Sequence, residues 1–168
     1  MIHVHVLDTS GLIQIKDDLP AKKLWETLRA MEEMVDEGKI TFPKQVEKEL
    51  VVYGVPDSIT AWCAAVTPRR QFPDPSLDDL SVVMKNPVVA KVCDWNNPPK
   101  SDPADPYVVA QAYVLVGDGV ECCVVTEDWK GKKDGNGNYK RSSLQMSCDA
   151  LSIPCSHTAD FLTAVGLD

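Results

Sequence analysis

Acidic side chains follow several of the segments that the sequence predicts to be regular. Asp8 comes directly after the β-rich run 2–7, and Glu127 and Asp128 come after the nearly continuous apolar run 120–126. Asp105 falls in the first turn of a helix that is predicted to begin with Asp102 as N-cap and Pro103 as its first residue. Carboxylates brought together from such places could bind Mg²⁺ or Mn²⁺, which prefer hard oxygen ligands, and a metal-bound water could attack a phosphodiester.

The elements that would position these acids alternate between strands and helices. Strands are predicted at 2–7, 39–42, 120–126 and 152–156. Helices are predicted after Asp8, at 21–37, from Pro43, at 57–66 and 77–94, from Pro103, and at 144–151 and 158–165. This alternation predicts an α/β fold of three layers, α/β/α, around a central, mainly parallel sheet. Ligands of such sheets bind beyond the carboxyl ends of the strands, so Asp8 and Asp128 are predicted to be neighbours.

The length and charge of the chain limit what it can be. A chain of 168 residues fits one domain, 1–168, in which the helices of about 57–94 form a helical insert. The net charge of −8 opposes nonspecific binding to a polyanion, so an enzyme of nucleic acids would need metal ions and a local basic patch. The basic residues that could steer RNA phosphates flank a predicted surface loop, 130–143, which could equally be only solvated: Lys130, Lys132, Lys133, Lys140 and Arg141.

The N-terminal sequence and the hydropathy pattern give an expected location. No stretch approaches the roughly 20 apolar residues of a membrane span, and the N-terminus lacks the pattern of a signal peptide, so no membrane contact and a cytoplasmic location are expected. The six cysteines are then expected to be reduced. A zinc site at Cys148, Cys155 and His157 is disfavoured because no paired C-x-x-C spacing accompanies them.

Four short segments give the chain a family resemblance. They are VLDTSGLI at the N-terminus, VEKEL after the second predicted strand, ADPYVVAQA in the helix with Asp105, and VVTED after the apolar run 120–126. In order and spacing they resemble the PIN-domain nucleases, whose fold is of the RNase H-like or 5′-nuclease-like type. The resemblance covers nearly the whole chain. It is greatest to small bacterial members of toxin-antitoxin type with a longer helical insert, such as the domain-of-unknown-function 4411 group.

The resemblance implies a function and a site. By this resemblance the chain is expected to be a Mg²⁺- or Mn²⁺-dependent endoribonuclease whose products carry a 5′-phosphate and a 3′-hydroxyl. The metal-binding, catalytic acids would be Asp8, Glu49, Asp105 and Asp128, with Ser10 and Thr126 as polar helpers. Many relatives have asparagine where Ser10 stands, and the fourth acid is left open between Asp128 and Glu127. By the same analogy the protein would be a toxin that a protein antitoxin silences, and a homodimer is left open.

Other interpretations compete with this one. Each acid alone has a structural explanation, because Asp8 can cap a helix, Asp105 can accept a backbone N–H, and Glu49 can lie on a solvated face. An aspartyl phosphatase of the HAD type would need a second Asp where Ser10 stands, and a metal-dependent adhesion fold would need a serine where Leu12 stands. A PIN-like domain without catalysis would bind RNA or protein. If the acids converge, their repulsion should raise at least one pKa, and a divalent cation should stabilise the fold.

Overall fold

A four-stranded parallel sheet lies at the centre of the computed structural model, which describes residues 3–53, 57–94 and 102–168. Its strands, in the order β2-β1-β3-β6, are Ile40–Thr41, Val4–Leu7, Cys122–Val125 and Cys155–Ser156. In the central register His5 pairs with Cys123 and Leu7 pairs with Val125. Both central strands are buried along their whole length, which is typical of parallel strands that are covered on both faces.

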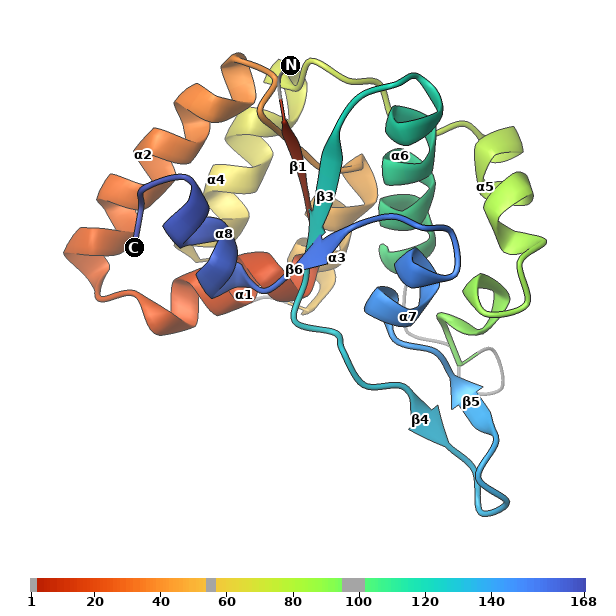
Figure 1. The fold of residues 1–168 in the computed structure, drawn as a ribbon. Coiled ribbons are helices and arrows are strands. Elements are labelled where there is room, and N and C mark those ends of the chain that lie inside the picture. Colours follow the sequence, from red (N-terminus) through yellow and green to blue (C-terminus); the bar gives the residue numbers. More distant parts are fainter. Residues whose placement is uncertain (1–2, 54–56, 95–101) are drawn as a thin grey trace.

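Helices cover both faces of this sheet. They are α1 (Thr9–Asp18), α2 (Ala21–Asp36), α3 (Lys44–Tyr53), α4 (Ser58–Val66), α5 (Leu77–Met84), α6 (Asp105–Gly117), α7 (Leu144–Asp149) and α8 (Thr158–Ala164), with the short 3₁₀ helices η1 (Thr67–Arg69) and η2 (Val89–Lys91). In Figure 1, α2, α4 and α8 lie on one side of the strands, and α6 and α5 lie on the other. The predicted three-layer α/β/α fold with a parallel sheet is therefore confirmed.

Most helices form where apolar spacing predicted them. In α2 the side chains Leu24, Leu28, Met31 and Val35 are all buried, because they recur on one helical face. The helix ends just before Gly38, whose φ of 71° is a left-handed conformation that glycine adopts without strain. The final helix, α8, likewise covers nearly the whole range that was predicted for it.

Among the predicted boundaries, those of two helices and of the last strand were wrong, since the strand expected over 152–156 is only Cys155–Ser156. The helix expected over 77–94 ends at Met84, and only the 3₁₀ turn η2 follows it. Pro87 explains the stop, because proline lacks an N–H and disfavours a helical conformation in the residue before it. The N-cap of α6 is Ala104 and not Asp102, so Asp105 is the first helical residue and Pro106 follows it.

The segment predicted as a surface loop over 130–143 contains an antiparallel hairpin. Strands β4 (Lys132–Lys133) and β5 (Tyr139–Arg141) pair with an irregularity at Lys132 and Lys133. In the turn, the Asp134 carboxylate accepts the backbone N–H groups of Asn136 and Asn138, which fixes a tight reversal. The hairpin projects from the body of the molecule below the sheet in Figure 1.

The buried apolar residues form one continuous cluster that joins the sheet to the helices on both faces. The region of the predicted helical insert takes part in it, because Trp62 of α4 is buried and its Nε1 donates to the Leu28 carbonyl at 3.0 Å. Among the described helices, none combines the length and the apolar character that a membrane crossing requires.

Candidate active site

Asp8 lies where the central strand β1 ends and α1 begins. Its backbone N–H donates to the Val125 carbonyl at 3.1 Å, so the pairing of β1 with β3 fixes its position. It is also the N-cap of α1, since its carboxylate accepts the Ser10 N–H at 3.3 Å. The helix-capping interpretation of Asp8 is thus correct, and it describes only one of the two carboxylate oxygens.

Two hydroxyl groups hold that same oxygen. Ser10 Oγ and Thr126 Oγ1 lie 2.5 Å and 2.9 Å from Asp8 Oδ2. The other oxygen, Oδ1, is buried and has no hydrogen-bond partner among the residues that the structure describes. Burial raises the pKa of Asp8, although the hydrogen bonds from Ser10 and Thr126 oppose this effect. The hydrogen bonds to Oδ2 therefore fix the orientation of this carboxylate, while Oδ1 is buried without a hydrogen bond from the described residues.

Glu49 reaches the same region from α3. Its Oε2 accepts the Ala104 backbone N–H at 2.7 Å and the Thr9 hydroxyl at 3.4 Å. The first of these contacts caps α6, since the N–H groups at the start of a helix lack partners within the helix. Burial, and after it the charge of Asp8, raises the pKa of Glu49, against the opposing hydrogen bond from Ala104. Glu49 is therefore not a residue of a solvated helix face.

Asp105 is the first residue of α6 and lies among the other acids. Burial raises its pKa well above the ordinary range, and the charges of Asp8, Glu49 and Asp128 raise it further. The Arg141 guanidinium, 3.6 Å from Asp105 Oδ2, offsets part of this effect. After burial, the charges of the neighbouring acids thus shift the pKa of Asp105 in the direction expected of converging carboxylates.

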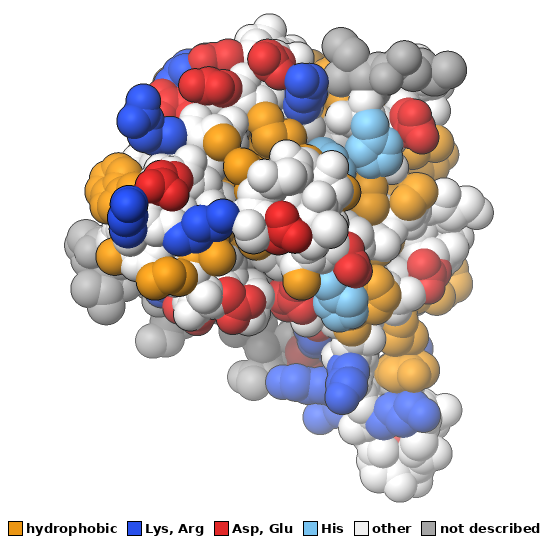
Figure 2. All heavy atoms as spheres, turned by 60° about the vertical axis from the view of Figure 1, so that its left-hand side comes forward, with side chains coloured by type: hydrophobic (Ala, Val, Ile, Leu, Met, Phe, Trp, Pro, Cys, Tyr) orange, Lys and Arg blue, Asp and Glu red, His pale blue; other side chains and the backbone are white. Residues whose placement is uncertain are grey.

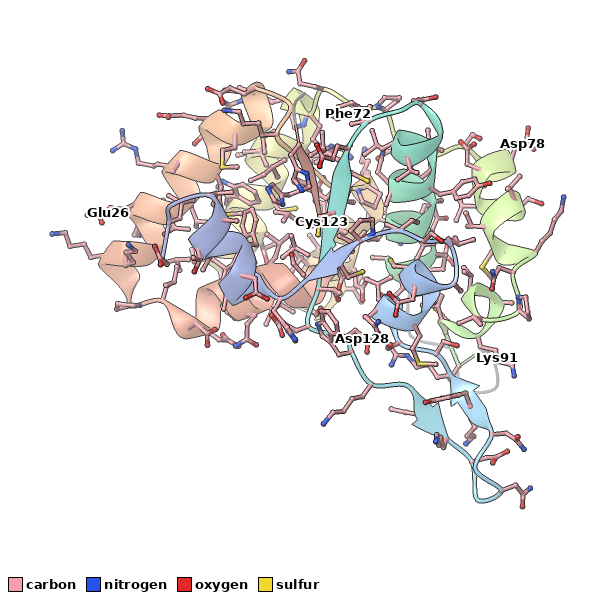
Figure 3. The ribbon with its side chains drawn as sticks, in the orientation of Figure 1. Glu26, Phe72, Asp78, Lys91, Cys123 and Asp128 are labelled. Atoms are coloured by element: carbon pink, nitrogen blue, oxygen red, sulfur yellow. The ribbon has the colours of Figure 1, made fainter. Side chains whose placement is uncertain are left out.

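Asp128 makes several contacts of its own. Its carboxylate accepts hydrogen bonds from both terminal nitrogens of Arg141, one of them at 3.2 Å, and from the Leu144 N–H at 2.9 Å at the start of α7. In Figure 3 it is labelled below the sheet, where the chain leaves towards the hairpin. Asp128 thus joins the acid cluster to the hairpin and to α7.

Glu127 points to a different set of partners. Its two carboxylate oxygens contact Nδ1 of His157 at 2.9 Å and the Thr158 N–H at 2.8 Å. Burial opposes ionisation, yet these hydrogen bonds together lower the pKa of Glu127. Of the two adjacent acids, it is Asp128 whose charge acts on Asp105.

One pocket of about 420 Å³ joins the predicted acids. It is lined by Asp8, Thr9, Ser10, Ile13, Glu49, Asp105, Glu127, Asp128 and Arg141. Asp8 and Asp128 line the same pocket, so their predicted proximity is confirmed. A larger pocket of about 430 Å³ lies at the opposite end of the sheet, around Val4, Phe72 and Glu121, and none of the four acids lines it.

The pocket does not have the form of a closed metal cage. Within residues 3–53, 57–94 and 102–168, no three His, Cys, Asp or Glu side chains are arranged so that they could hold one ion together. Mg²⁺, however, usually keeps several waters and takes only one or two carboxylates. The unpartnered Oδ1 of Asp8 and the repelled charge of Asp105 suit an ion of that kind, because a divalent cation would offset both.

The five basic residues that were predicted to steer RNA fall into two groups. Arg141 lines the acid pocket, and Lys132 borders an adjoining cavity of about 250 Å³ together with Glu49, Asp105 and Arg141. Lys130, Lys133 and Lys140 are exposed on or beside the hairpin, and Lys133 Nζ lies 5.0 Å from the ring centre of Tyr139. Figure 2 shows Lys and Arg side chains gathered on the hairpin at the lower end of this face.

Sequence reasoning missed two features of the site. Thr9 lines the pocket and bonds Glu49, and its place beside Asp8 at the start of a helix was the only signal for it. Arg141 was predicted as a possible RNA-binding residue of a surface loop, but its position in the pocket wall beside Asp128 was not predicted. The local sequence does not predict this hairpin, because its strands are short and lysine-rich and lack an alternation of apolar and polar residues.

The comparison with known families agrees with one part of the resemblance. A family model described as Domain of unknown function (DUF4411) matches residues 5–168, a range that contains all four acids. No curated protein matches the chain significantly. Because the family model spans nearly the whole chain, the protein belongs to the DUF4411 family.

Proposed function

We propose that this protein is a PIN-type endoribonuclease that hydrolyses RNA at the acid pocket. The observation that carries the proposal is the meeting of Asp8, Glu49 and Asp105 in one pocket at the carboxyl end of β1, with Asp8 Oδ1 buried and unpartnered among the described residues. Groups that share a pocket and raise each other's pKa are more frequent at functional sites than elsewhere. The segments that resemble PIN nucleases are the ones that supply these residues.

Asp8 and Asp105 are the residues best placed to hold Mg²⁺ or Mn²⁺, with Glu49 and Asp128 beside them. When bound, such an ion supplies a water of lowered pKa and offsets the charge that develops on the phosphate. Ser10 and Thr126 orient Asp8, and substitution of residues that orient a metal ligand typically lowers metal affinity by about 10- to 100-fold. Arg141 adds a positive charge at the pocket wall, where a phosphate oxygen would lie.

The hairpin would hold the RNA backbone beside the pocket. Lys130, Lys132, Lys133 and Lys140 are exposed there, and Lys132 also borders the cavity next to Asp105. This local positive surface meets the need that the net charge of −8 creates, because phosphate binding depends on neutralisation by Lys and Arg.

A cleavage assay with matched acid variants tests the proposal. Purified protein is incubated with a mixed RNA pool and Mn²⁺, and the product ends are mapped. We expect cleavage to fall by about 100-fold or more in Asp8→Asn and in Asp105→Asn, since a lost metal ligand removes the main source of transition-state stabilisation. Asp78→Asn is the control, because Asp78 is exposed on α5 and lies away from the pocket in Figure 3. Cleavage that survives in folded Asp8→Asn would refute the proposal.

A noncatalytic RNA- or protein-binding domain is the second candidate. The observation that favours it is the Arg141–Asp128 ion pair, since a guanidinium already neutralises part of the acid charge that would attract a metal ion. Calorimetry separates the two candidates. Saturable Mn²⁺ binding that is lost in Asp8→Asn and Asp105→Asn supports the nuclease, and no binding by the folded parent at millimolar Mn²⁺ supports the noncatalytic domain.

The same resemblance extends the proposal to a biological role. We propose that the protein is the toxin of a toxin-antitoxin pair in the cytoplasm, and that a protein antitoxin blocks the acid pocket. Induced expression should then arrest bacterial growth, whereas Asp8→Asn expressed to the same level should not. A homodimer belongs to the same set of proposals, and sedimentation of the purified chain tests it.

A further inference from the structure

Two aromatic rings stack beside Glu127, a residue that lines the acid pocket. The rings of Trp129 and His157 have centroids 4.1 Å apart and planes inclined by 21°. Trp129 is held in place because its Nε1 donates to the Thr126 carbonyl at 2.8 Å. The two rings come from the segment after β3 and from the residue that caps α8, so the fold itself brings them together.

Besides stacking on Trp129, His157 contacts Glu127, and its side chain is still about half exposed. Its Nδ1 lies 2.9 Å from Oε2 of Glu127, a residue that lines the acid pocket. The side chain of His157 is nevertheless 48% exposed, while Trp129 is only partly exposed. Trp129 is therefore the more buried ring of the stack and His157 the more exposed one, and His157 contacts the pocket through Glu127.

We propose that His157, supported by Trp129, is a stacking platform for an unpaired nucleobase of single-stranded RNA whose backbone passes the acid pocket. The inference rests on the proposed function, which supplies the RNA. Aromatic rings bind bases in single strands by stacking, with little dependence on sequence, because every base has a π-face. In a duplex both faces of each base are covered by its neighbours, so the platform selects single strands.

The net negative charge of the molecule explains why RNA binding would need a contribution from base stacking. A chain of net charge −8 gains little from nonspecific attraction to a polyanion, and the basic side chains of the hairpin must offset the nearby acids as well as the RNA. Stacking adds affinity that does not depend on phosphate neutralisation. It would also place one nucleotide at a fixed distance from Asp8 and Asp105.

Binding to oligouridylate, measured by fluorescence anisotropy without divalent metal, tests the platform. The 168-residue chain carries Asp8→Asn in every sample so that the RNA stays intact. In this assay the parent is the chain with Asp8→Asn alone. Adding His157→Ala should lower the affinity by about 5- to 150-fold, the range expected when one stacked base is lost. His157→Phe keeps a ring and should retain most of the affinity, whereas His157→Gln keeps a polar partner for Glu127 and should bind as weakly as His157→Ala.

Two comparisons control for other causes. Trp25→Ala removes a tryptophan that is 62% exposed on α2 and does not line the acid pocket, so it should leave RNA binding unchanged. An abasic oligomer of the same length should bind parent and His157→Ala equally, since it has phosphates and no bases. Melting temperatures confirm that each variant is folded.

The outcomes separate this inference from the proposed function. Three results would each overturn the platform: equal oligouridylate binding by parent and His157→Ala, a His157→Phe variant as weak as His157→Ala, or no binding by the parent. In any of these cases, RNA cleavage by the protein with Asp8 intact would still support the nuclease. Ring-dependent binding of oligouridylate without any cleavage would support the platform and refute the nuclease.

Discussion

The oxygen atoms of Asp8 have unequal roles. Oδ2 is held by Ser10 and Thr126, while Oδ1 is buried without a partner among the described residues. A buried carboxylate oxygen without a hydrogen bond costs free energy, and such costs are retained where function requires them. The residues that orient Asp8 should therefore control what it binds.

Thr126 provides the most direct test of that control. Thr126→Val keeps the shape of the side chain and removes the hydroxyl that bonds Asp8 at 2.9 Å and accepts the Asp128 N–H at 3.0 Å. We expect Mn²⁺ affinity, measured by calorimetry, to fall by about 10- to 100-fold. Thr126→Ser keeps the hydroxyl and should bind Mn²⁺ nearly as well as the parent. Equal loss in both variants would mean that packing, and not the hydroxyl, matters.

The raised pKa of Asp105 predicts how stability depends on pH. Its folded pKa lies above its unfolded value, so the metal-free folded state holds more protons between the two. The stabilising contribution of the protonated group is complete below about pH 4, where the unfolded carboxyl titrates, and is lost as pH rises through the folded pKa. Asp105→Asn does not ionise and should melt higher than the parent at pH 8, by about 2–4 °C for each 1 kcal/mol of relieved repulsion.

This difference in melting temperature should shrink towards pH 4, because the parent carboxyl is then protonated as well. Calorimetric melting in metal-free buffer at several pH values measures it. The exposed acid Asp78 supplies the control, since Asp78→Asn should change the melting temperature little at any pH. A gain for Asp105→Asn that is the same at pH 4 and pH 8 would contradict the electrostatic explanation.

At this scale the sequence identified the acids better than it identified their partners. Asp8 and Asp105 could be predicted because each occupies a defined place at the end of a strand or the start of a helix. The choice between Glu127 and Asp128 could not be made, since it depends on His157 and Arg141, which reach the two acids from distant segments. Side-chain pairing of this kind leaves no periodic signal in a single sequence.

Helix α1 lies so close to β3 that a side chain would not fit between them. A Cβ atom on Gly11 would lie 2.9 Å from the Val125 carbonyl oxygen and 3.5 Å from the Thr158 hydroxyl oxygen. This close approach allows Ser10, in the same turn of α1, to reach Asp8 and the Glu127 N–H. The glycine is thus a requirement of the site and of the packing together.

Substitution of Gly11 should reverse the usual effect of alanine in a helix. Alanine normally stabilises a helix interior relative to glycine by about 1 kcal/mol. Here the methyl group must push α1 from the sheet, so Gly11→Ala should cost about 1–3 kcal/mol in the free energy of unfolding, measured with urea. Gly117→Ala at the end of α6 is the matched control, because its Cβ would meet no atom within 4 Å, and it should be neutral or slightly stabilising. A stable Gly11→Ala would show that the contact can relax.

The predicted elements were most accurate where apolar periodicity is strong and least accurate where tertiary contacts decide. Helices α2 and α8 were predicted almost to the residue, α2 from its apolar spacing and α8 with its end at Gly166. The start of α6 was misplaced, because the Ala104 N–H finds its acceptor in Glu49 of another helix. The hairpin was missed because two short, polar strands give the same pattern as a loop.

The fold brings the acids of the pocket to one end of the sheet, with the hairpin beside them. Asp8, Glu49 and Asp105 come from three separate elements, so folding itself forces their charges together. A ligand that relieves this repulsion should therefore stabilise the entire fold.

Manganese should raise the melting temperature of the parent protein. At a Mn²⁺ concentration 100 times the dissociation constant, binding contributes about 2.7 kcal/mol to stability. For a chain of this size that corresponds to a rise of roughly 5–11 °C. Asp8→Asn should lose most of the rise, whereas Asp78→Asn should keep it. A parent melting temperature that stays flat across the Mn²⁺ series would count against the metal site.

The parallel pairing of β1 with β3 also determines when the pocket can form during synthesis. Thr126 Oγ1 bonds Asp8, which lies 118 residues earlier in the chain. At translation rates of about 5–20 residues per second, roughly 6–24 s separate the appearance of these two residues. During that interval β1 has emerged without its central partner, and the acids have no common pocket. A nascent chain still on the ribosome, which is itself made largely of RNA, would thus remain without an assembled site until most of its length has been made.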